Sequence, residues 1–247
     1  MNDRKEAGAV RLSVVVPVYN EEGSIGKLFG EILDMCRAGL DGVPFDYEIL
    51  VVNDGSSDGT DKVCRGLAPL RYIRFPENRG QTAAMDCGFH QAKGELIAAL
   101  DGDGQNDPAD IPNMVRYLLA EDLDAVSGWR RDRKDTFGKR TASRMAYLAR
   151  QILLRDGIHD SGCTLKVYRR ECFEGWHLKN DWHRFIPALL KQRGFRVGEI
   201  EVHHRPRSAG HTKYNITRGF YAIRDMLAIR RLARKKAETE AGRRKRV

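Results

Sequence analysis

Several features that would assign this chain of 247 residues to a common protein class are missing from it. No apolar run approaches the roughly 18 to 20 residues that a membrane-spanning helix needs. The polar N-terminus has no hydrophobic segment of the kind found in secretory signals. We therefore expect a protein of the cytoplasm.

Cysteine patterns that indicate a disulfide framework or a zinc-cysteine site are also absent. The five cysteines are odd in number and form no C-x-x-C pair, so reduced and mostly buried thiols are expected. There is no Walker sequence and no G-x-G-x-x-G, which disfavours a P-loop enzyme and a dinucleotide-dependent oxidoreductase. The stretch starting at Asp54 begins like an EF-hand loop, but its twelfth position is Arg65 instead of Glu.

Positive charge is abundant but unevenly placed. The net charge is +9, of which residues 230–247 contribute +7 and residues 129–150 contribute +6. The remainder of the chain is therefore mildly acidic. Such basic clusters suit polyanions, namely phosphates, anionic lipid or nucleic acid. For the extreme C-terminus, a merely solvated tail is the alternative.

Short apolar runs alternate with helical patterns through the first half of the chain. Strands are predicted at 12–16, 48–52, 70–75, 94–100 and 124–129, and helices at 24–38, 60–67, 80–92 and 108–119. Because the strand runs are continuously apolar, both faces of the sheet should be covered by helices. The expected fold class is α/β with a mostly parallel sheet.

The second half is less regular. Residues 130–155 have a basic, helical pattern, and a strand flanked by turns is expected within 160–172. A helix over 183–194 and a half-exposed strand over 195–204 should follow. Further on, an apolar helical stripe runs beside several arginines; it consists of Ile216, Phe220, Ile223 and Leu227.

Three polar loops follow predicted strands, at 19–22, 53–58 and 101–107. Because the carboxyl ends of parallel strands meet at one edge of a sheet, these loops should lie together. In an extended chain Asp101 and Asp103 would point to the same side, and Gln105 would continue that spacing. Such oxygen ligands suit Mg²⁺ or Mn²⁺. A turn with a helix cap is the alternative reading of this loop, and Asp107 and Asp110 are expected to be caps.

Taken together, these loops resemble a known family. The stretches VVVPVYNEE, VVNDGSSDGT, NRGQTAAMDCGF and DGDGQNDPADIP are similar to those of inverting family-2 glycosyltransferases with the GT-A fold. The stretches SGWRRDRKD, KRTASRM, DSGCTLKVYRRE, HRFIPAL and HHRPRSAGHTKY resemble the polyprenyl- or dolichyl-phosphate branch, which includes dolichol-phosphate mannose synthases. The resemblance covers about residues 11 to 230 and implies a catalytic domain over 1–215.

The resemblance implies a nucleotide-sugar site at the sheet edge. Asp54 would contact the base or ribose, although its neighbour Asn53 stands where the family usually has Asp. Gly104 stands where the family often has a bulky apolar residue. Metal binding and catalysis would involve Asp101 and Asp103, with Gln105 as a further metal ligand. The rest of the nucleotide pocket would be formed by Pro17, Tyr19, Asn20 and Glu21.

The implied acceptor is a polyprenyl (undecaprenyl or dolichyl) phosphate, which requires cations because it is anionic. By resemblance, the phosphate-binding residues would be Arg130, Lys139, Arg140, Arg205 and Lys213, with Arg130 and Arg140 also catalytic. Further residues that could close over the diphosphate or acceptor are His183, Arg184, Arg207 and His211. The alternative for each basic residue is a solvated surface.

The predicted helix over 216–236 suits a membrane interface, and the basic, disordered tail over 237–247 would add attraction to anionic lipid. We therefore expect peripheral association with the cytoplasmic face of the membrane. Packing of the helix on the catalytic domain or on a second subunit is the alternative, and a separate membrane-spanning partner protein also stays open.

The expected reaction is a metal-dependent, inverting transfer of a hexose-type sugar, of the mannose or glucose kind, from a GDP- or UDP-sugar. The second hypothesis keeps the donor site and replaces the lipid by a polysaccharide or other non-lipid acceptor. A nucleic-acid-binding module is disfavoured by the acidic body and by the absence of a recognisable binding motif.

Overall fold

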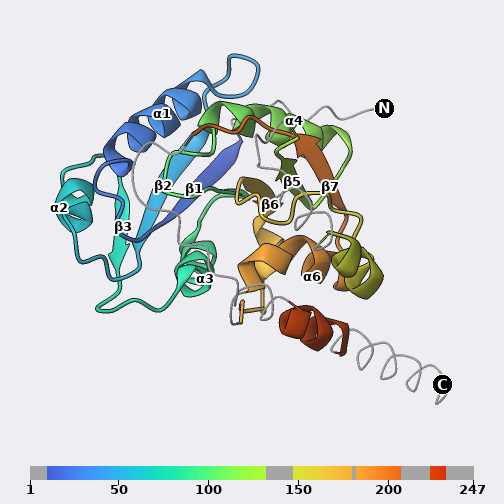
Figure 1. The fold of residues 1–247 in the computed structure, drawn as a ribbon. Helices are drawn as coiled ribbons and strands as arrows, with labels where there is room; N and C mark the ends of the chain where they lie inside the picture. Colours follow the sequence, from blue (N-terminus) through green and yellow to red (C-terminus); the bar gives the residue numbers. More distant parts are fainter. Residues whose placement is uncertain (1–9, 132–146, 180–181, 207–222, 232–247) are drawn as a thin grey trace.

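A seven-stranded sheet with helices on both faces organises the chain in the computed structural model, which describes residues 10–131, 147–179, 182–206 and 223–231 (Figure 1). The strand order is β3-β2-β1-β4-β6-β5-β7. All neighbouring pairs are parallel except the two that involve β6. The predicted α/β class with a mostly parallel sheet is confirmed.

The first half of the chain follows the predicted alternation of strands and helices. The elements are β1 (Arg11–Val18), α1 (Ile25–Ala38), β2 (Asp46–Asn53), α2 (Thr60–Arg65), β3 (Arg71–Arg74), α3 (Gln81–Gln91) and β4 (Leu96–Ala99). Strand β1 lies between β2 and β4 and is parallel to both. The carboxyl ends of these strands therefore share one edge.

The second half contains the 3₁₀ helix η1 (Pro108–Asp110), α4 (Ile111–Ala120), β5 (Ala125–Trp129), β6 (Lys166–Arg169), η2 (Arg170–Phe173), η3 (Trp182–Phe185), α6 (Ile186–Gln192) and β7 (Val197–Glu201). Strand β6 is antiparallel to both β4 and β5 and lies between them. The single helix predicted over 183–194 is divided into η3 and α6. The α-helix begins late because Pro187 occupies its first turn, where a missing N–H is tolerated.

Continuous apolar runs in the strands are explained by helices on both faces of the sheet. Val14 and Val16 of β1 belong to the core cluster that includes α1 and α4. Val15 points to the other face and belongs to the cluster that includes α3 and α6. Successive side chains of a strand alternate between faces, so all three valines are buried.

Two helices extend the apolar packing beyond the sheet. One covers residues 147–154 and the other residues 223–231. Met226 and Ile229 are buried against Trp182, Phe185 and Leu189, and Leu153 and Leu154 pack on the same cluster. None of the helices in the described ranges is long and apolar enough to cross a membrane. The remaining members of the predicted stripe, Ile216 and Phe220, lie outside the described residues.

Helix α3 packs unusually close to β1 at Gly88. A Cβ atom at this position would overlap Cγ1 of Val15 and would lie 3.4 Å from Cγ2 of Val52. Both valines are fully buried and β-branched, so neither can easily turn away. In contrast, a Cβ at Gly30 of α1 would meet nothing within 4 Å.

The two glycines should therefore respond oppositely to alanine. Gly88→Ala should lower the free energy of unfolding by about 1 to 3 kcal/mol, because the added methyl group overpacks the core. Gly30→Ala, the matched control, should raise it by about 0.5 to 1 kcal/mol, because alanine favours the helix and has room. Denaturant unfolding of both variants measures this, and equal effects would contradict the close packing of α3 on β1.

Candidate active site

The loops after β1 and β2 are interlocked by hydrogen bonds. The backbone N–H of Asn20 donates to the hydroxyl of Ser56 at 2.9 Å, and the N–H of Ser57 donates to Asn20 Oδ1 at 2.9 Å. The N–H of Glu21 donates to the hydroxyl of Thr60 at 2.8 Å. Asn20 has a φ of 58°, a left-handed conformation that asparagine tolerates better than most residues. The predicted convergence of these two loops is confirmed.

The acidic loop that follows β4 packs on the end of β1. The hydroxyl of Ser24, the residue before α1, donates to the carbonyl oxygen of Gly102 at 2.8 Å. A Cβ at Gly102 would lie 2.6 Å from Cγ1 of Val18 and 3.3 Å from the carbonyl oxygen of Pro17. The absence of a side chain thus permits this close approach. All three predicted loops consequently share one edge of the sheet, beside the half-buried Tyr19.

Asp54 fixes the loop before α3. Its two carboxylate oxygens accept from the backbone N–H groups of Arg79 and Gly80, at 2.7 and 2.9 Å. Its neighbour Asn53 is fully buried, and its side-chain Oδ1 accepts from the N–H of Ser56 at 2.8 Å.

The other end of the Asn53 amide donates to the hydroxyl of Tyr72 at 2.7 Å, and that hydroxyl donates to Asp61. Because Tyr72 gives its proton to Asp61, its oxygen needs a donor on the other side. An ionised Asp at position 53 could not supply one. The asparagine at this position is therefore explained by hydrogen bonds within the protein.

The acidic loop is a turn, so the extended geometry expected for Asp101 to Gln105 is wrong. Gly104 has a φ of 75°, and the N–H of Gln105 donates to Asp103 Oδ1 at 3.0 Å. Aspartate often stabilises a turn in this way, by accepting from the backbone two residues on. Asp103 is only 5% exposed.

Asp101 and Asp103 are nevertheless close enough to repel one another. Burial and the negative charge of Asp103 raise the pKa of Asp101 to about 6. Gln81, the first residue of α3, donates from Nε2 to Asp101 Oδ1 at 2.6 Å. The backbone N–H of Asp101 donates to Asn106 Oδ1, which also accepts from the hydroxyl of Thr164. The loop thus holds two carboxylates together although their charges repel.

The donor set fits a hard divalent cation. Asp101 and Asp103 offer carboxylate oxygens, and the half-buried Gln105 offers an amide oxygen. Burial and the neighbouring charge of Asp103 raise the pKa of Asp101, so ionisation of both carboxylates is disfavoured without a further positive charge. Mg²⁺ or Mn²⁺ bound by these residues would supply that charge.

Two largely buried cations lie behind the acidic loop: Arg130, which was predicted from the sequence, and Lys166, which was not. Arg130 donates from Nε and Nη2 to the two oxygens of Asp160, at 2.7 and 3.0 Å. The pKa of Arg130 is raised despite its burial, because the hydrogen bonds and charge of Asp160 outweigh that burial. Lys166 of β6 is 2% exposed and donates from Nζ to the carbonyl oxygen of Cys163.

Both cations act on the acidic loop. The charges of Lys166 and Arg130 each lower the pKa of Asp101, although less than burial raises it. Lys166 is buried on a strand whose next two residues are also buried. A lysine within the stretch CTLKVYR was the sequence feature that could have predicted a buried cation. A buried ammonium is costly without partners. Lys166 has the carbonyl oxygen of Cys163, and the negative charges of Asp160 and Asp101 oppose the lowering of its pKa that burial causes.

Arg205 ties the acidic loop to α1. It donates to Glu31 Oε2 at 2.7 Å and to Asp107 at 3.1 Å, and its backbone N–H donates to the carbonyl oxygen of Gln105. Asp107 also caps η1 by accepting from the N–H of Ala109, as predicted, whereas the predicted cap Asp110 accepts instead from the backbone N–H of His203. A pocket of about 230 Å³ beside Gly104 is lined by Lys27, Glu31 and Arg205 among others.

The structure brings together most of the predicted site residues that it describes. Pro17 lies near the carboxyl end of β1, Tyr19, Asn20, Glu21 and Asp54 lie on the loops beside the acidic loop, and Arg130 lies behind it. His183 is buried, and its Nδ1 lies 2.7 Å from the hydroxyl of Thr82 in the first turn of α3. Arg184 is half-buried. Five further predicted residues lie outside the described ranges, namely Lys139, Arg140, Arg207, His211 and Lys213.

Comparison with known proteins gives a family and two close relatives. The family model described as Glycosyl transferase family 2 matches residues 13–176. A dodecaprenyl-phosphate galacturonate synthase of Rhizobium johnstonii is 40% identical over 238 residues, covering 93% of this chain and 69% of the relative. An undecaprenyl-phosphate 4-deoxy-4-formamido-L-arabinose transferase of Aeromonas hydrophila is 34% identical, covering 83% of this chain and 63% of the relative. The chain thus spans about two thirds of these relatives.

Solved structures share the fold. Mannosyl-3-phosphoglycerate synthase from Rubrobacter xylanophilus superposes with a TM-score of 0.69 at 20% identity, over 93% of this chain and 75% of that one. Glucosyl-3-phosphoglycerate synthase from Mycobacterium tuberculosis, in complex with Mg²⁺ and uridine diphosphate, has a TM-score of 0.64 at 19% identity. That match covers 90% of this chain and 78% of the other. At these identities the likeness establishes the fold, and the predicted GT-A architecture is confirmed.

The raised pKa of Asp101 predicts that the metal-free site destabilises the folded protein by an amount that depends on pH. Since the pKa is about 6 in the folded protein and near 3.8 otherwise, the folded protein binds the proton more tightly, and stability is lost as pH rises through that window. Asp101→Asn cannot ionise there. In EDTA, its melting temperature relative to wild type should therefore increase between pH 4 and pH 6 and then stay level. A difference that does not change with pH would contradict the shifted pKa.

Proposed function

Because the chain belongs to glycosyl transferase family 2, we propose that it transfers a hexose-type sugar from a GDP- or UDP-sugar to a polyprenyl phosphate, with inversion at the anomeric carbon. The observation that carries the proposal is the paired Asp101 and Asp103 at the edge where the β1 and β2 loops interlock. Two relatives, one 40% and one 34% identical, are both named for a polyprenyl-phosphate acceptor, which supports this choice.

The proposed donor site uses the loops after β1, β2 and β4. Asn20, Glu21 and Asp54 lie beside the acidic loop, where a nucleoside diphosphate would meet a metal held by Asp101, Asp103 and Gln105. The cation would neutralise charge that develops on the leaving diphosphate. A solved neighbour of the same fold carries Mg²⁺ and uridine diphosphate, which is in keeping with this assignment.

The proposed acceptor site uses cations near the acidic loop. A phosphate oxygen that attacks the sugar is already ionised, so the protein must bind and orient it and does not need a strong base. We assign this task to Arg130 with Lys139, Arg140 and Lys213. Arg205 belongs to the same group, but its side chain is shared between Glu31 and Asp107, so its contribution includes holding the loop.

Two helices outside the sheet offer apolar surface for a membrane-embedded acceptor. The exposed side chains are Leu148 and Ile152 on one helix, and Ile223 and Leu227 on the other. Their opposite sides meet in one apolar cluster, and both helices lie at the same end of the molecule (Figure 1). Arg224 is exposed beside this surface and suits anionic lipid. We therefore propose peripheral association with the membrane through residues 147–154 and 223–231.

Release of nucleoside diphosphate tests the proposed reaction. The protein is incubated with a panel of GDP- and UDP-sugars and Mg²⁺ or Mn²⁺, with and without polyprenyl phosphate in detergent. Release that needs both the metal and the lipid phosphate is expected, and it would also identify the donor. Donor binding without lipid-dependent release would favour the second candidate, an acceptor that is not a lipid. The phosphoglycerate-linked names of the solved neighbours are consistent with that alternative.

Removing one carboxylate of the acidic loop should abolish most of this turnover. Asp103→Asn should lower kcat at least about 100-fold, because the cation that stabilises the leaving diphosphate loses a ligand. Asp34→Asn, on the exposed side of α1, is the matched control and should be neutral. Near-normal rates for Asp103→Asn at saturating metal would overturn the proposed metal site.

Membrane binding should depend on the exposed apolar side chains. Ile152→Glu or Ile223→Glu should weaken binding to anionic phospholipid vesicles about tenfold or more, because each inserts a charge where apolar area would be buried. Leu119→Glu, at an exposed apolar position of α4, should leave binding unchanged. Vesicle co-sedimentation measures all three, and equal binding would rule out the assigned surface.

A further inference from the structure

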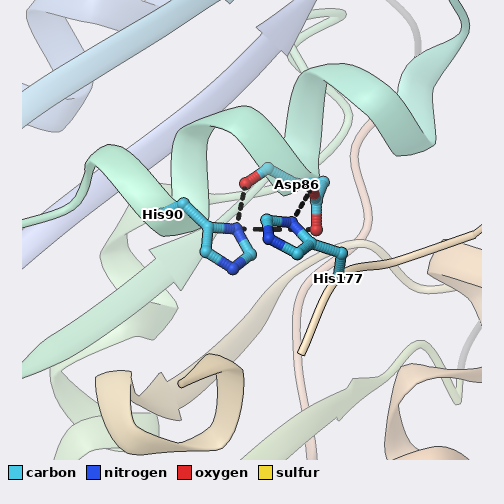
Figure 2. A group of neighbouring side chains, drawn as sticks. All are labelled: Asp86, His90 and His177. Atoms are coloured by element: carbon cyan, nitrogen blue, oxygen red, sulfur yellow. Dashed lines mark hydrogen bonds and ion pairs between the residues drawn. The ribbon is translucent and has the colours of Figure 1, made fainter. Parts of the chain in front are cut away.

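A second group of metal-ligating side chains lies along α3, apart from the acidic loop. Asp86 and His90 are one turn apart on this helix, and His177 reaches them from the segment after η2 (Figure 2). One ligand atom from each of the three lies within 4.8 Å of the other two. Asp86 is five residues and His90 nine residues beyond Gln81, so the group is about 7 to 13 Å along the helix from the residue that contacts Asp101.

The distances in this group match those of a tetrahedral zinc site. With zinc–nitrogen and zinc–oxygen bonds of about 2.0 to 2.2 Å, neighbouring ligand atoms in a tetrahedron lie about 3.4 Å apart. His177 Nδ1 lies 2.9 Å from Asp86 Oδ2, and His90 Nδ1 lies 3.5 Å from Asp86 Oδ1. Both distances lie within about half an ångström of that spacing. His90 Nδ1 also lies 2.8 Å from the backbone carbonyl oxygen of Asp86, so a cation bound through this atom would replace that contact as well as the one between His177 and Asp86.

The ligand types point to a different metal from that of the acidic loop. Two imidazoles and one carboxylate form a borderline donor set, which suits Zn²⁺ better than Mg²⁺. The imidazole rings are stacked with centroids 4.0 Å apart, and the side chains of His177 and His90 are 68% and 27% exposed, so an ion can reach them. Asp86 is also anchored, because its Oδ1 accepts from the backbone N–H of Leu178 at 2.7 Å.

We propose that Asp86, His90 and His177 bind one Zn²⁺ ion, with water completing the tetrahedron. The ion would replace the proton that His177 now shares with Asp86 and would fasten the segment around residues 175–179 to α3. Further along the chain, His183 of η3 contacts Thr82 in the first turn of α3. Zinc and the contact of His183 would thus attach this part of the chain to α3 at two points. Zinc binding would also raise the stability of the folded protein.

Zinc titration of the full, tag-free protein tests this proposal. After EDTA treatment and its removal, the protein competes with a chromogenic zinc chelator in millimolar Mg²⁺, which keeps Zn²⁺ from the oxygen ligands of the acidic loop. One ion per chain is expected, with a rise in melting temperature on binding. His90→Gln and His177→Gln should each weaken Zn²⁺ binding at least about tenfold.

His159→Gln is the matched control. Like His177, His159 is exposed, and its Nδ1 lies 2.7 Å from one carboxylate oxygen, that of Glu199. It is not part of the three-residue group, so its replacement should leave zinc affinity unchanged. The melting temperatures of the zinc-free variants report whether each one folds. Absence of binding at micromolar Zn²⁺, or binding that both histidine variants retain, would overturn the proposal.

Discussion

The confinement of like charges at the end of β4 is the constraint on which the site depends. Asp101 and Asp103 are held close in a largely buried loop, where carboxylates would ordinarily separate or take up protons. The protein compensates partially, with Lys166 and the Arg130–Asp160 pair behind the loop. Since Asp160 already neutralises much of Arg130, the balance stays short of positive charge. A cation and a negatively charged substrate would therefore complete the site electrostatically.

Segments far apart in the sequence act as one mechanical unit around this loop. Asn106 Oδ1 accepts from the N–H of Asp101 and from Thr164, which precedes β6 by two residues. Arg205, after β7, joins Asp107 to Glu31 of α1. The stretches that resemble the family are thus in contact through hydrogen bonds. A substitution in any one of these stretches is therefore expected to shift the carboxylates of Asp101 and Asp103.

The sequence predicted the parallel half of the fold well, because buried parallel strands have continuous apolar runs that need no partner to be recognised. It did not predict that β6 is antiparallel, since an apolar pattern contains no information about strand direction. The turn at Gly104 was only the alternative prediction for the acidic loop, because an Asp-x-Asp spacing fits an extended chain as well. Partners distant in sequence were also hidden: Arg130 binds Asp160, and His177 binds Asp86 across 91 positions.

The position of β6 has a consequence for how the chain acquires its structure during synthesis. Strands β3, β2, β1 and β4 come from one continuous stretch and can pair with one another as soon as that stretch is complete. Strand β6, the other neighbour of β4, is synthesised only after residues 100–165. Strand β5 is synthesised before β6 but can join these strands only when β6 is present. A nascent chain therefore has an open edge at β4, and contacts of such long sequence separation form slowly. Strand β6, only four residues long, thus joins the first four strands of the sheet to β5 and β7.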